Sequence, residues 1–261
     1  MLNLTVAELR KAFSLPSAYV GIALATVGTV GLSALAASSR RAAMDRGDTN
    51  AFRNSSPLDA GFEIVGPGVI GVAVLAVVIM SSEYTPNRKD AGAGRQILVS
   101  LTSVPRRSLL LAAKALVVAV LTTLIAMISI LSGLAVTQAV LGDHGHSFGT
   151  VLDKSGWRIA GAVAFWVFSA LIALAVTVVT RSGVIPLVVL IVNSSMVSVS
   201  FLLTKVTPLA KYLPDVAGAQ SFTTRYPADD MLSPATGALV MAGWTALLLV
   251  AAGWIFARRD A

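Results

Sequence analysis

The sequence lacks cysteine and is poor in charged residues. None of its 261 residues is cysteine, which excludes disulfides, thiol catalysis and cysteine-ligated metal. Only 13% of the residues are charged, whereas an ordinary soluble domain carries roughly 25%. So few charges cannot cover the surface of a globular domain of this size in water. The composition therefore argues against a soluble enzyme.

Most of the sequence consists of long uncharged segments. A helix that crosses a bilayer needs about 20 apolar residues. The six uncharged runs cover residues 12–39, 64–82, 115–142, 159–180, 182–204 and 231–257. Lipid offers no partners to backbone N–H and C=O groups, so these runs must be helical, and they lack the alternation of a barrel strand. The sequence predicts an all-α integral membrane protein with one transmembrane domain, residues 1–261, and spans at about 18–38, 63–82, 109–140, 158–180, 184–204 and 234–257.

The distribution of charge predicts how the spans are oriented. With six spans, both termini and the second and fourth loops lie on one side of the membrane. That side carries 11 basic and 4 acidic residues and the other side 9 of each, so the net charge of +7 lies on one side. Lys and Arg resist translocation, so the basic side is expected to be cytoplasmic. Anionic lipid headgroups explain the positive charge without nucleic acid as a partner.

Motifs of catalysis are missing from the sequence. It contains no phosphate-binding Gly-x-x-x-x-Gly-Lys-Ser/Thr loop, no His-Glu-x-x-His and no Gly-x-Ser-x-Gly. Its two histidines, His144 and His146, lie in a polar loop, and a solvated loop is the better interpretation than a metal site. No expected span carries a central acidic residue, which favours an external ATPase over an ion gradient as the energy source. We therefore expect no catalytic residues, no metal site and no cofactor in this chain.

Two stretches outside the expected spans have apolar residues at helical spacing. Leu2, Val6, Leu9 and Phe13 form a stripe on residues 1–15, which favours an amphipathic helix in the headgroup plane over a frayed tail. In the basic loop of residues 83–108, a small apolar knob follows an arginine, and its residues are Arg95, Ile97, Leu98 and Leu101. This knob either dips into lipid or docks a soluble cytoplasmic partner.

Several residues within or beside the spans carry further expectations. Lys114 lies about two turns into the third span, where extension of its ammonium to the headgroups is favoured over a role in transport. Gly21, Ala25 and Gly28 suit close packing of helices. The fifth span contains a polar cluster, whose members include Asn193, Ser194, Ser198 and Ser200. These groups either hydrogen bond between helices or line a substrate path. The loop of residues 205–231 is partly apolar and interrupted by prolines, which is typical of a segment that re-enters the membrane without crossing it.

The order of these elements resembles that of a known family. Ser82-Glu83-Tyr84 ends the second span, and the run from Ser100 to Arg107 is followed by Ala112-Ala113-Lys114. Leu213-Pro214 precedes the last span and Arg258-Arg259-Asp260 ends the chain. Over essentially its whole length the chain resembles an ABC-2-type permease, the transmembrane subunit of a bacterial ATP-binding-cassette exporter. The stretch around residues 85–92 is longer than in that family.

The resemblance implies a division of labour between chains. Permeases of this family form dimers, here a homodimer rather than a heterodimer, and each copy binds a separate ATPase that carries ATP and Mg. The N-terminal helix and a coupling helix in the first cytoplasmic loop receive the movement of the ATPase. Short re-entrant helices before the last span cap the outer end. The expected function is export of a hydrophobic or amphipathic molecule, such as an antibiotic, peptide or lipid, across the bacterial inner membrane.

Two other classes of function remain open on the sequence. A membrane anchor or sensor that docks a cytoplasmic partner without transport needs similar surfaces. A membrane-embedded enzyme needs a cluster of catalytic side chains at membrane depth, and the sequence offers none.

Overall fold

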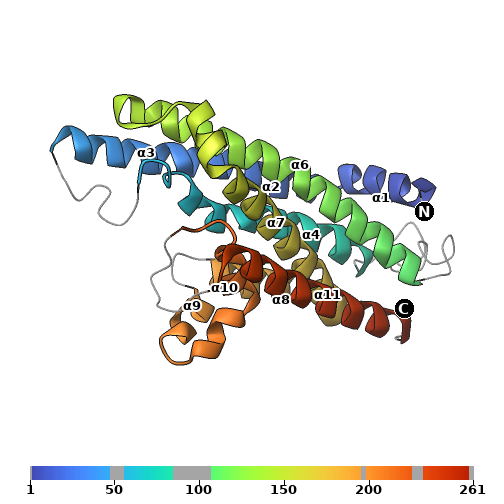
Figure 1. Cartoon of the computed structure of the whole chain (residues 1–261). Coiled ribbons are helices and arrows are strands. Elements are labelled where there is room, and N and C mark those ends of the chain that lie inside the picture. The colour runs from blue at the N-terminus through green and yellow to red at the C-terminus, as the bar shows by residue number, and fades with distance from the viewer. Residues whose placement is uncertain (1, 48–55, 85–106, 195–197, 225–231, 259–261) are drawn as a thin grey trace.

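The chain folds into a bundle of long helices. A computed structural model describes residues 2–47, 56–84, 107–194, 198–224 and 232–258. Regular structure in these residues is helical throughout, without strands, as the sequence predicts. Both termini lie at the same end of the bundle, on the right of Figure 1. We call this the termini end and the other the opposite end.

Five helical segments in the described residues are long and apolar enough to cross a membrane. The first contains α2 (Pro16–Ala23), the π-helical turn η1 (Leu24–Gly28) and α3 (Thr29–Asp45). The second contains the 3₁₀ turn η2 (Phe62–Ile64), α4 (Val65–Ser81) and the 3₁₀ turn η3 (Ser82–Tyr84). The others are α6 (Arg107–Leu141) with the 3₁₀ turn η5 (Gly142–His144), α7 (Phe148–Thr180) and α11 (Pro234–Arg258).

The expected fifth span, residues 184–204, contains two shorter helices. These are α8 (Val184–Ser194) and α9 (Val199–Thr204), with residues 195–197 outside the described part. In Figure 1, α7 runs to the termini end and α11 starts from the opposite end, so the chain returns between them through α8 and α9. The 3₁₀ helix η6 (Pro208–Tyr212) and α10 (Pro214–Ala219) then lead toward α11.

The N-terminal segment forms a helix of its own, α1 (Leu2–Ser14). It is separated from α2 at Leu15, whose backbone is extended (φ −89°, ψ 113°) because Pro16 follows it. Pro16 then occupies the first turn of α2, where its missing N–H costs no hydrogen bond. The two helices are therefore free to differ in direction.

The hairpin of α6 and α7 is longer than the expected spans. The two helices have 35 and 33 residues, which corresponds to about 50 Å at 1.5 Å per residue. A hydrocarbon core is about 30 Å thick, so both helices extend well beyond it. The start of α7 lies ten residues before the expected span because the Ser147 side chain accepts a hydrogen bond from Thr150 N and caps the helix there.

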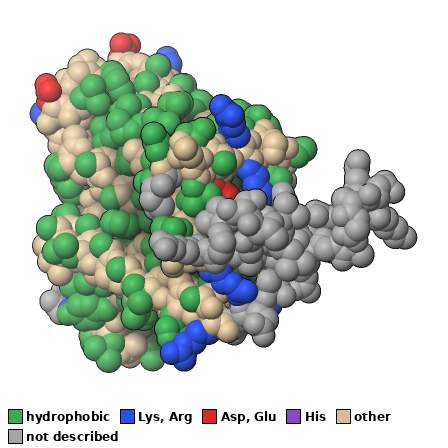
Figure 2. Space-filling model, turned by 90° about the vertical axis from the view of Figure 1, so that its right-hand side faces the viewer, with side chains coloured by type: hydrophobic (Ala, Val, Ile, Leu, Met, Phe, Trp, Pro, Cys, Tyr) green, Lys and Arg blue, Asp and Glu red, His purple; other side chains and the backbone are tan. Residues whose placement is uncertain are grey.

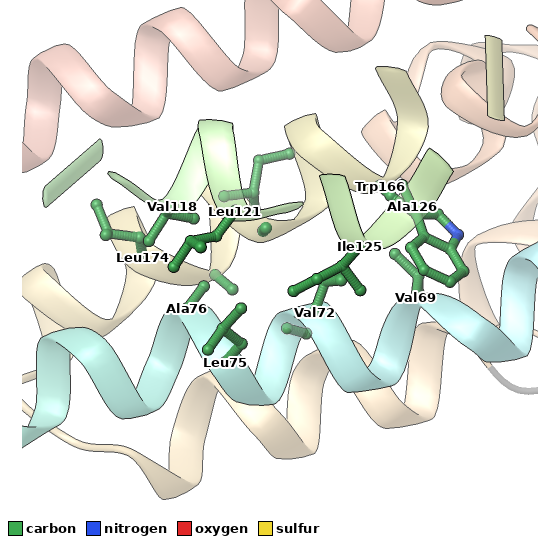
Figure 3. Packing of buried hydrophobic residues seen from close by; sticks show 14 of the residues in the cluster. Val69, Val72, Leu75, Ala76, Val118, Leu121, Ile125, Ala126, Trp166 and Leu174 are labelled. Carbon is green, nitrogen blue, oxygen red and sulfur yellow. The ribbon is translucent and has the colours of Figure 1, made fainter. Parts of the chain in front are cut away.

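The core lies where α4, α6 and α7 meet. Figure 3 shows Val72 and Leu75 of α4 against Leu121 and Ile125 of α6, and the ring of Trp166 of α7 near Val69. The indole Nε1 of Trp166 donates to the Val65 carbonyl at 2.8 Å, so its one polar atom is satisfied inside the bundle.

Small residues allow α4 to contact the first span at backbone distance. A Cβ at Gly71 would lie 2.2 Å from Ala25 N, and one at Gly21 would lie 2.8 Å from Leu75 N. The prediction of close packing is therefore confirmed for Gly21 and Ala25. It was wrong for Gly28, because a Cβ there would meet no atom of another segment within 4 Å.

Candidate functional site: a buried ion-pair cluster beneath α1

At the termini end, α1, α4 and α6 are joined by four charged side chains. Lys114 Nζ of α6 lies 2.5 Å from Glu8 Oε2 of α1 and 2.7 Å from Glu83 Oε1, which follows α4 in η3. Lys11 of α1 also pairs with Glu83 Oε1. We call Glu8, Lys11, Glu83 and Lys114 the inner cluster. Its two carboxylates and two ammonium groups balance in charge.

Burial distinguishes the inner cluster from an ordinary surface network. The side chains of Lys114 and Glu83 are 1% and 0% exposed, and Glu8 is buried as well. Taking such charges out of water is costly, and only close pairing and hydrogen bonds offset that cost. Removing one partner leaves a buried charge uncompensated, so each member holds the others in place.

Of the three charged residues of α1, Glu8 and Lys11 pair with the bundle and Arg10 is exposed. Glu8 and Ala12 are buried, one helical turn apart, on the face toward the bundle. Leu2, Val6 and Phe13 of the apolar stripe are exposed, with 77% of Leu2 accessible, and Leu9 is half-buried. The described helix is thus apolar on its outer face and charged toward the protein. Its placement in a headgroup layer stays a prediction.

Lys114 does not extend to the headgroups as the sequence suggested. Its ammonium reaches the termini end of the bundle, but Glu8 and Glu83 receive it there. The expectation was wrong because the sequence offers no sign that α1 folds back over the start of α6. The only sign of this cluster in the sequence was a lysine within an otherwise apolar segment. It identified Lys114 as unusual but suggested lipid headgroups, rather than Glu8 and Glu83, as its partners.

The inner cluster also joins the two described elements on either side of residues 85–106, which lie outside the described part of the chain. η3 ends just before these residues and α6 begins just after them, and Glu83 of η3 pairs with Lys114 of α6. Arg107 Nη1, at the start of α6, donates to the Phe256 carbonyl of α11 at 3.3 Å. Figure 2 views this end, where Lys and Arg side chains in blue are visible beside flanks covered mostly in green.

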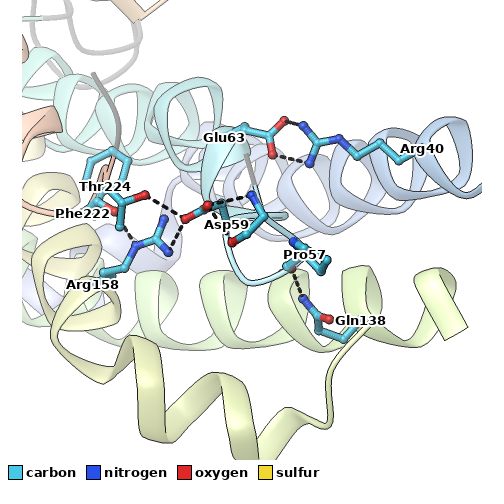
Figure 4. Close-up of polar contacts among 9 residues, drawn as sticks. Arg40, Pro57, Asp59, Glu63, Gln138, Arg158, Phe222 and Thr224 are labelled. Carbon is cyan, nitrogen blue, oxygen red and sulfur yellow. Dashed lines mark hydrogen bonds and ion pairs between the residues drawn. The ribbon is translucent and has the colours of Figure 1, made fainter. Parts of the chain in front are cut away.

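A second polar network closes the opposite end. Arg158 of α7 is buried and donates from Nη1 to Asp59 Oδ1 and from Nε to the Phe222 carbonyl, both at 2.8 Å. Its guanidinium carbon lies 3.9 Å from the centroid of the Phe62 ring. Thr224 Oγ1 donates to the same Asp59 oxygen at 2.8 Å. Figure 4 shows how Arg158 thus connects the segment before α4 with the segment after α10.

Two more polar contacts lie at this end, one partly buried around Asp59 and one more exposed between Arg40 and Glu63. Asp59 Oδ2 accepts hydrogen bonds from Ser56 N and Oγ, both at 2.8 Å. Burial raises the pKa of Asp59, but the hydrogen bonds from Ser56 and Thr224 and the charge of Arg158 together bring that pKa below its usual value. The Arg40–Glu63 pair beside it is bidentate and more exposed (Figure 4).

The structure describes only some of the residues that the sequence singled out. Arg95, Ile97, Leu98 and Leu101 lie outside the described residues. Asn193 and Ser194 belong to α8, without a description of their side chains. Ser200 is buried, and its hydroxyl and that of Ser198 hydrogen bond to Asp215. In the described part of the chain, no group of three or more His, Cys, Asp or Glu side chains is placed to hold a metal ion.

Sequence reasoning missed the partners in all of these contacts. The sequence placed Asp59 in a solvated loop, Arg158 at the edge of the expected span 158–180 and Asp215 in the segment expected to re-enter the membrane. Glu8 lay between the apolar residues of the N-terminal stripe. Their contacts join segments far apart in the chain, so no local pattern reveals them. Comparison with protein-family models and with curated proteins found no match.

Proposed function

We propose that this chain is the membrane-spanning permease subunit of an ATP-driven exporter. It moves a hydrophobic or amphipathic substrate, such as an antibiotic, a peptide or a lipid-like molecule, with power from a separate ATPase subunit. The observation that supports the proposal best is the inner cluster, which joins α1 to η3 and α6, the described elements on either side of residues 85–106. Five long apolar helices supply the membrane domain.

The inner cluster suits the transmission of movement. In the proposal the ATPase docks on the knob of Arg95, Ile97, Leu98 and Leu101 in that loop. Displacement of the loop acts on its stems at Glu83 and Lys114 and hence on α4 and α6. Because Glu8 and Lys11 hold the same two charges, α1 moves with the stems. Because buried ion pairs hold these helices together, a displacement of one helix also displaces the others.

The remaining parts of the proposal follow the same architecture. α8 and α9 together make a sixth crossing, the short helices η6 and α10 re-enter from outside, and both termini are cytoplasmic. Two copies of the chain associate as a homodimer in the bacterial inner membrane. ATP and Mg bind to the partner ATPase, while this chain contacts lipid and performs no catalysis of its own. Nucleic acid is not a partner.

Co-purification tests the proposal most directly. A tagged chain extracted from its native membrane in gentle detergent should bring an ATPase subunit with it, recognisable by a phosphate-binding loop in its sequence. Recovery of the chain alone, across several mild detergents, would count against an exporter. Recovery with a partner that lacks ATPase activity would favour the anchor or sensor.

A pair of variants tests the docking knob. Leu101→Asp places a charge on its apolar face and should abolish stimulation of the ATPase while leaving membrane insertion intact. Ser100→Asp adds the same charge one residue earlier and serves as the matched control. Equal stimulation in both variants and the unaltered chain would move the docking site elsewhere.

A further inference from the structure

The last turns of α11 expose a tryptophan and an arginine that contact each other. The side chain of Trp254 is 58% exposed, and the guanidinium carbon of Arg258, one helical turn later, lies 4.2 Å from the centroid of its ring. Side chains on a helix lean toward its N-terminus, so the arginine lies back over the ring. The cation–π contact holds the guanidinium in place and leaves N–H donors available to another group.

A second arginine reaches the same part of α11 from α6. Arg107 Nη1 donates to the Phe256 carbonyl at 3.3 Å. A Cβ at Gly253 would lie 3.7 Å from Leu111 Cδ2, so the first turns of α6 pack against the last turns of α11. Each of the two helices therefore contributes one guanidinium to this end of their contact.

Arg258 differs from the lysines of the inner cluster, whose charges are balanced by two glutamates. Within the described part of the chain, Arg258 takes part in no ion pair. Trp166 and Trp244 each donate their indole N–H to a backbone carbonyl at 2.8 Å, whereas the indole N–H of Trp254 has no acceptor among the described residues. The end of α11 thus presents positive charge and N–H donors to its surroundings.

An apolar stripe runs from this end along the outer face of α11. Leu247 and Val250 are 60% and 71% exposed, and together with Trp254 they follow one another at spacings of three and four residues, which places them on one face. Because α11 is a candidate membrane span, this face suits an acyl chain. A phospholipid has the complementary order of groups, with a phosphate at one end and apolar chains behind it.

A second copy of the chain fits this surface less well than a lipid does. Two copies inserted in one membrane share their direction, so a two-fold contact along the stripe would bring both Arg258 side chains to the same depth. Like charges that face each other across an interface oppose association. An anionic lipid has the opposite charge and meets no such opposition.

We propose that Arg258, Arg107 and Trp254 bind the headgroup phosphate of an anionic phospholipid. Guanidinium groups bind phosphate oxygens through paired charge-assisted hydrogen bonds, and the indole N–H adds one more donor. An acyl chain then lies along Val250 and Leu247. Phosphatidylcholine has the same phosphate but also a cationic choline, which the arginines repel, so the site selects headgroups of net negative charge. The proposal does not depend on the exporter function, since it needs only that α11 lies in a bilayer.

Quenching of tryptophan fluorescence by brominated lipids tests the site. The purified chain is placed in phosphatidylcholine nanodiscs that contain increasing fractions of brominated phosphatidylglycerol or brominated phosphatidylcholine. The chain has four tryptophans, so the difference between the unaltered chain and Trp254→Phe isolates the signal of Trp254. Half-maximal quenching of Trp254 should need about fivefold less phosphatidylglycerol than phosphatidylcholine, or less still, because one arginine beside an anionic lipid contributes about that factor.

Two matched variants separate this site from a general attraction of the basic chain for anionic lipid. Arg258→Gln should abolish the preference for phosphatidylglycerol. Arg10→Gln removes the same charge at an exposed position of α1, which lies at the other side of the bundle from α11 (Figure 1), and should keep the preference.

Three results would overturn the proposal. The first is equal quenching by the two lipids in the unaltered chain. The second is an equal loss of preference in Arg258→Gln and Arg10→Gln, which would show that only the total charge matters. The third is the absence of quenching of Trp254 by either lipid, which would show that protein covers this face of α11.

Discussion

The two ends of the bundle are held together by polar networks of different kinds. At the termini end, Glu8, Lys11, Glu83 and Lys114 pair charge with charge, and the central lysine and glutamate are sealed from solvent. At the opposite end, Arg158 divides its bonds among a carboxylate, a backbone carbonyl and an aromatic ring. The side chain of Asp59 is 17% exposed and that of Glu63 is 43% exposed.

The two networks differ in how much stability is lost when a contact breaks. Loss of one partner from a set of buried ion pairs leaves an uncompensated charge, so the helices that these pairs join must move together. A network with neutral acceptors and partial access to water loses one contact at smaller cost. We infer that the helices at the termini end move as one rigid unit, whereas the contacts at the opposite end can rearrange at a smaller cost in free energy. Five predictions test that inference.

The largest effect is expected for Lys114→Met. Glu8 then loses its ion-pair partner while buried, and Glu83 loses one of the two lysines that pair with it. Such a vacancy should lower the free energy of unfolding by about 3–5 kcal/mol. Thermal unfolding in detergent measures the loss, with Lys154→Met at an exposed site of α7 as the control.

A double variant that removes both partners of the Glu8–Lys114 pair tests the same inference. Glu8→Met added to Lys114→Met removes the unpaired carboxylate and leaves the Lys11–Glu83 pair. Because apolar replacement of a buried ion pair is often neutral, the double variant should recover most of the lost stability. If Lys114→Met lowers the free energy of unfolding by no more than the control does, the inner cluster does not hold these helices together rigidly.

An intermediate effect is expected for Arg158→Leu. The variant gives up the Asp59 pair, the bond to the Phe222 carbonyl and the contact with the Phe62 ring. A loss of about 2–4 kcal/mol follows, smaller than at the termini end because Asp59 keeps Ser56 and Thr224 and gains access to water. Measured by the same unfolding assay, a loss larger than that of Lys114→Met would reverse the ranking of the two ends.

Acidification should weaken the opposite end only under strongly acid conditions. The pKa of Asp59 is lower in the folded chain than its usual value, so the ionised carboxylate stabilises the fold. That contribution is complete above the unfolded pKa of about 3.9 and is lost as the pH falls through the lower folded value. The difference in melting temperature between the unaltered chain and Asp59→Asn should be constant from about pH 8 to 5 and shrink below about pH 4. Shrinkage already near neutral pH would exclude this assignment.

The smallest effect is expected for Arg40→Ala. Its bidentate pair with Glu63 is partly exposed, and such pairs contribute about 1 kcal/mol or less. The loss should fall further in 1 M salt, which screens exposed charges. An effect that persists in salt and exceeds that of Arg158→Leu would show that the opposite end depends on this pair instead.

The sequence predicted the parts of this fold that depend on local composition. Uncharged runs located the five long helices, and the stripe of Leu2, Val6, Leu9 and Phe13 indicated the N-terminal helix. The partners of Lys114 and Arg158 could not be predicted in the same way. Ion pairs between residues about 100 positions apart depend on how helices pack, and one sequence contains no signal for that. Asp215 was missed as well, because its hydrogen-bond partners Ser198 and Ser200 lie in a separate helical segment.

The hairpin of α6 and α7 offers a practical handle on the orientation of the whole chain. Its tip lies between the spans expected at residues 109–140 and 158–180, and Gly149 near the tip has open space around the position of a Cβ. Since the native chain has no cysteine, a single Gly149→Cys variant carries one thiol and nothing that competes with it. A membrane-impermeant maleimide added to whole cells then reports which side of the membrane this tip faces.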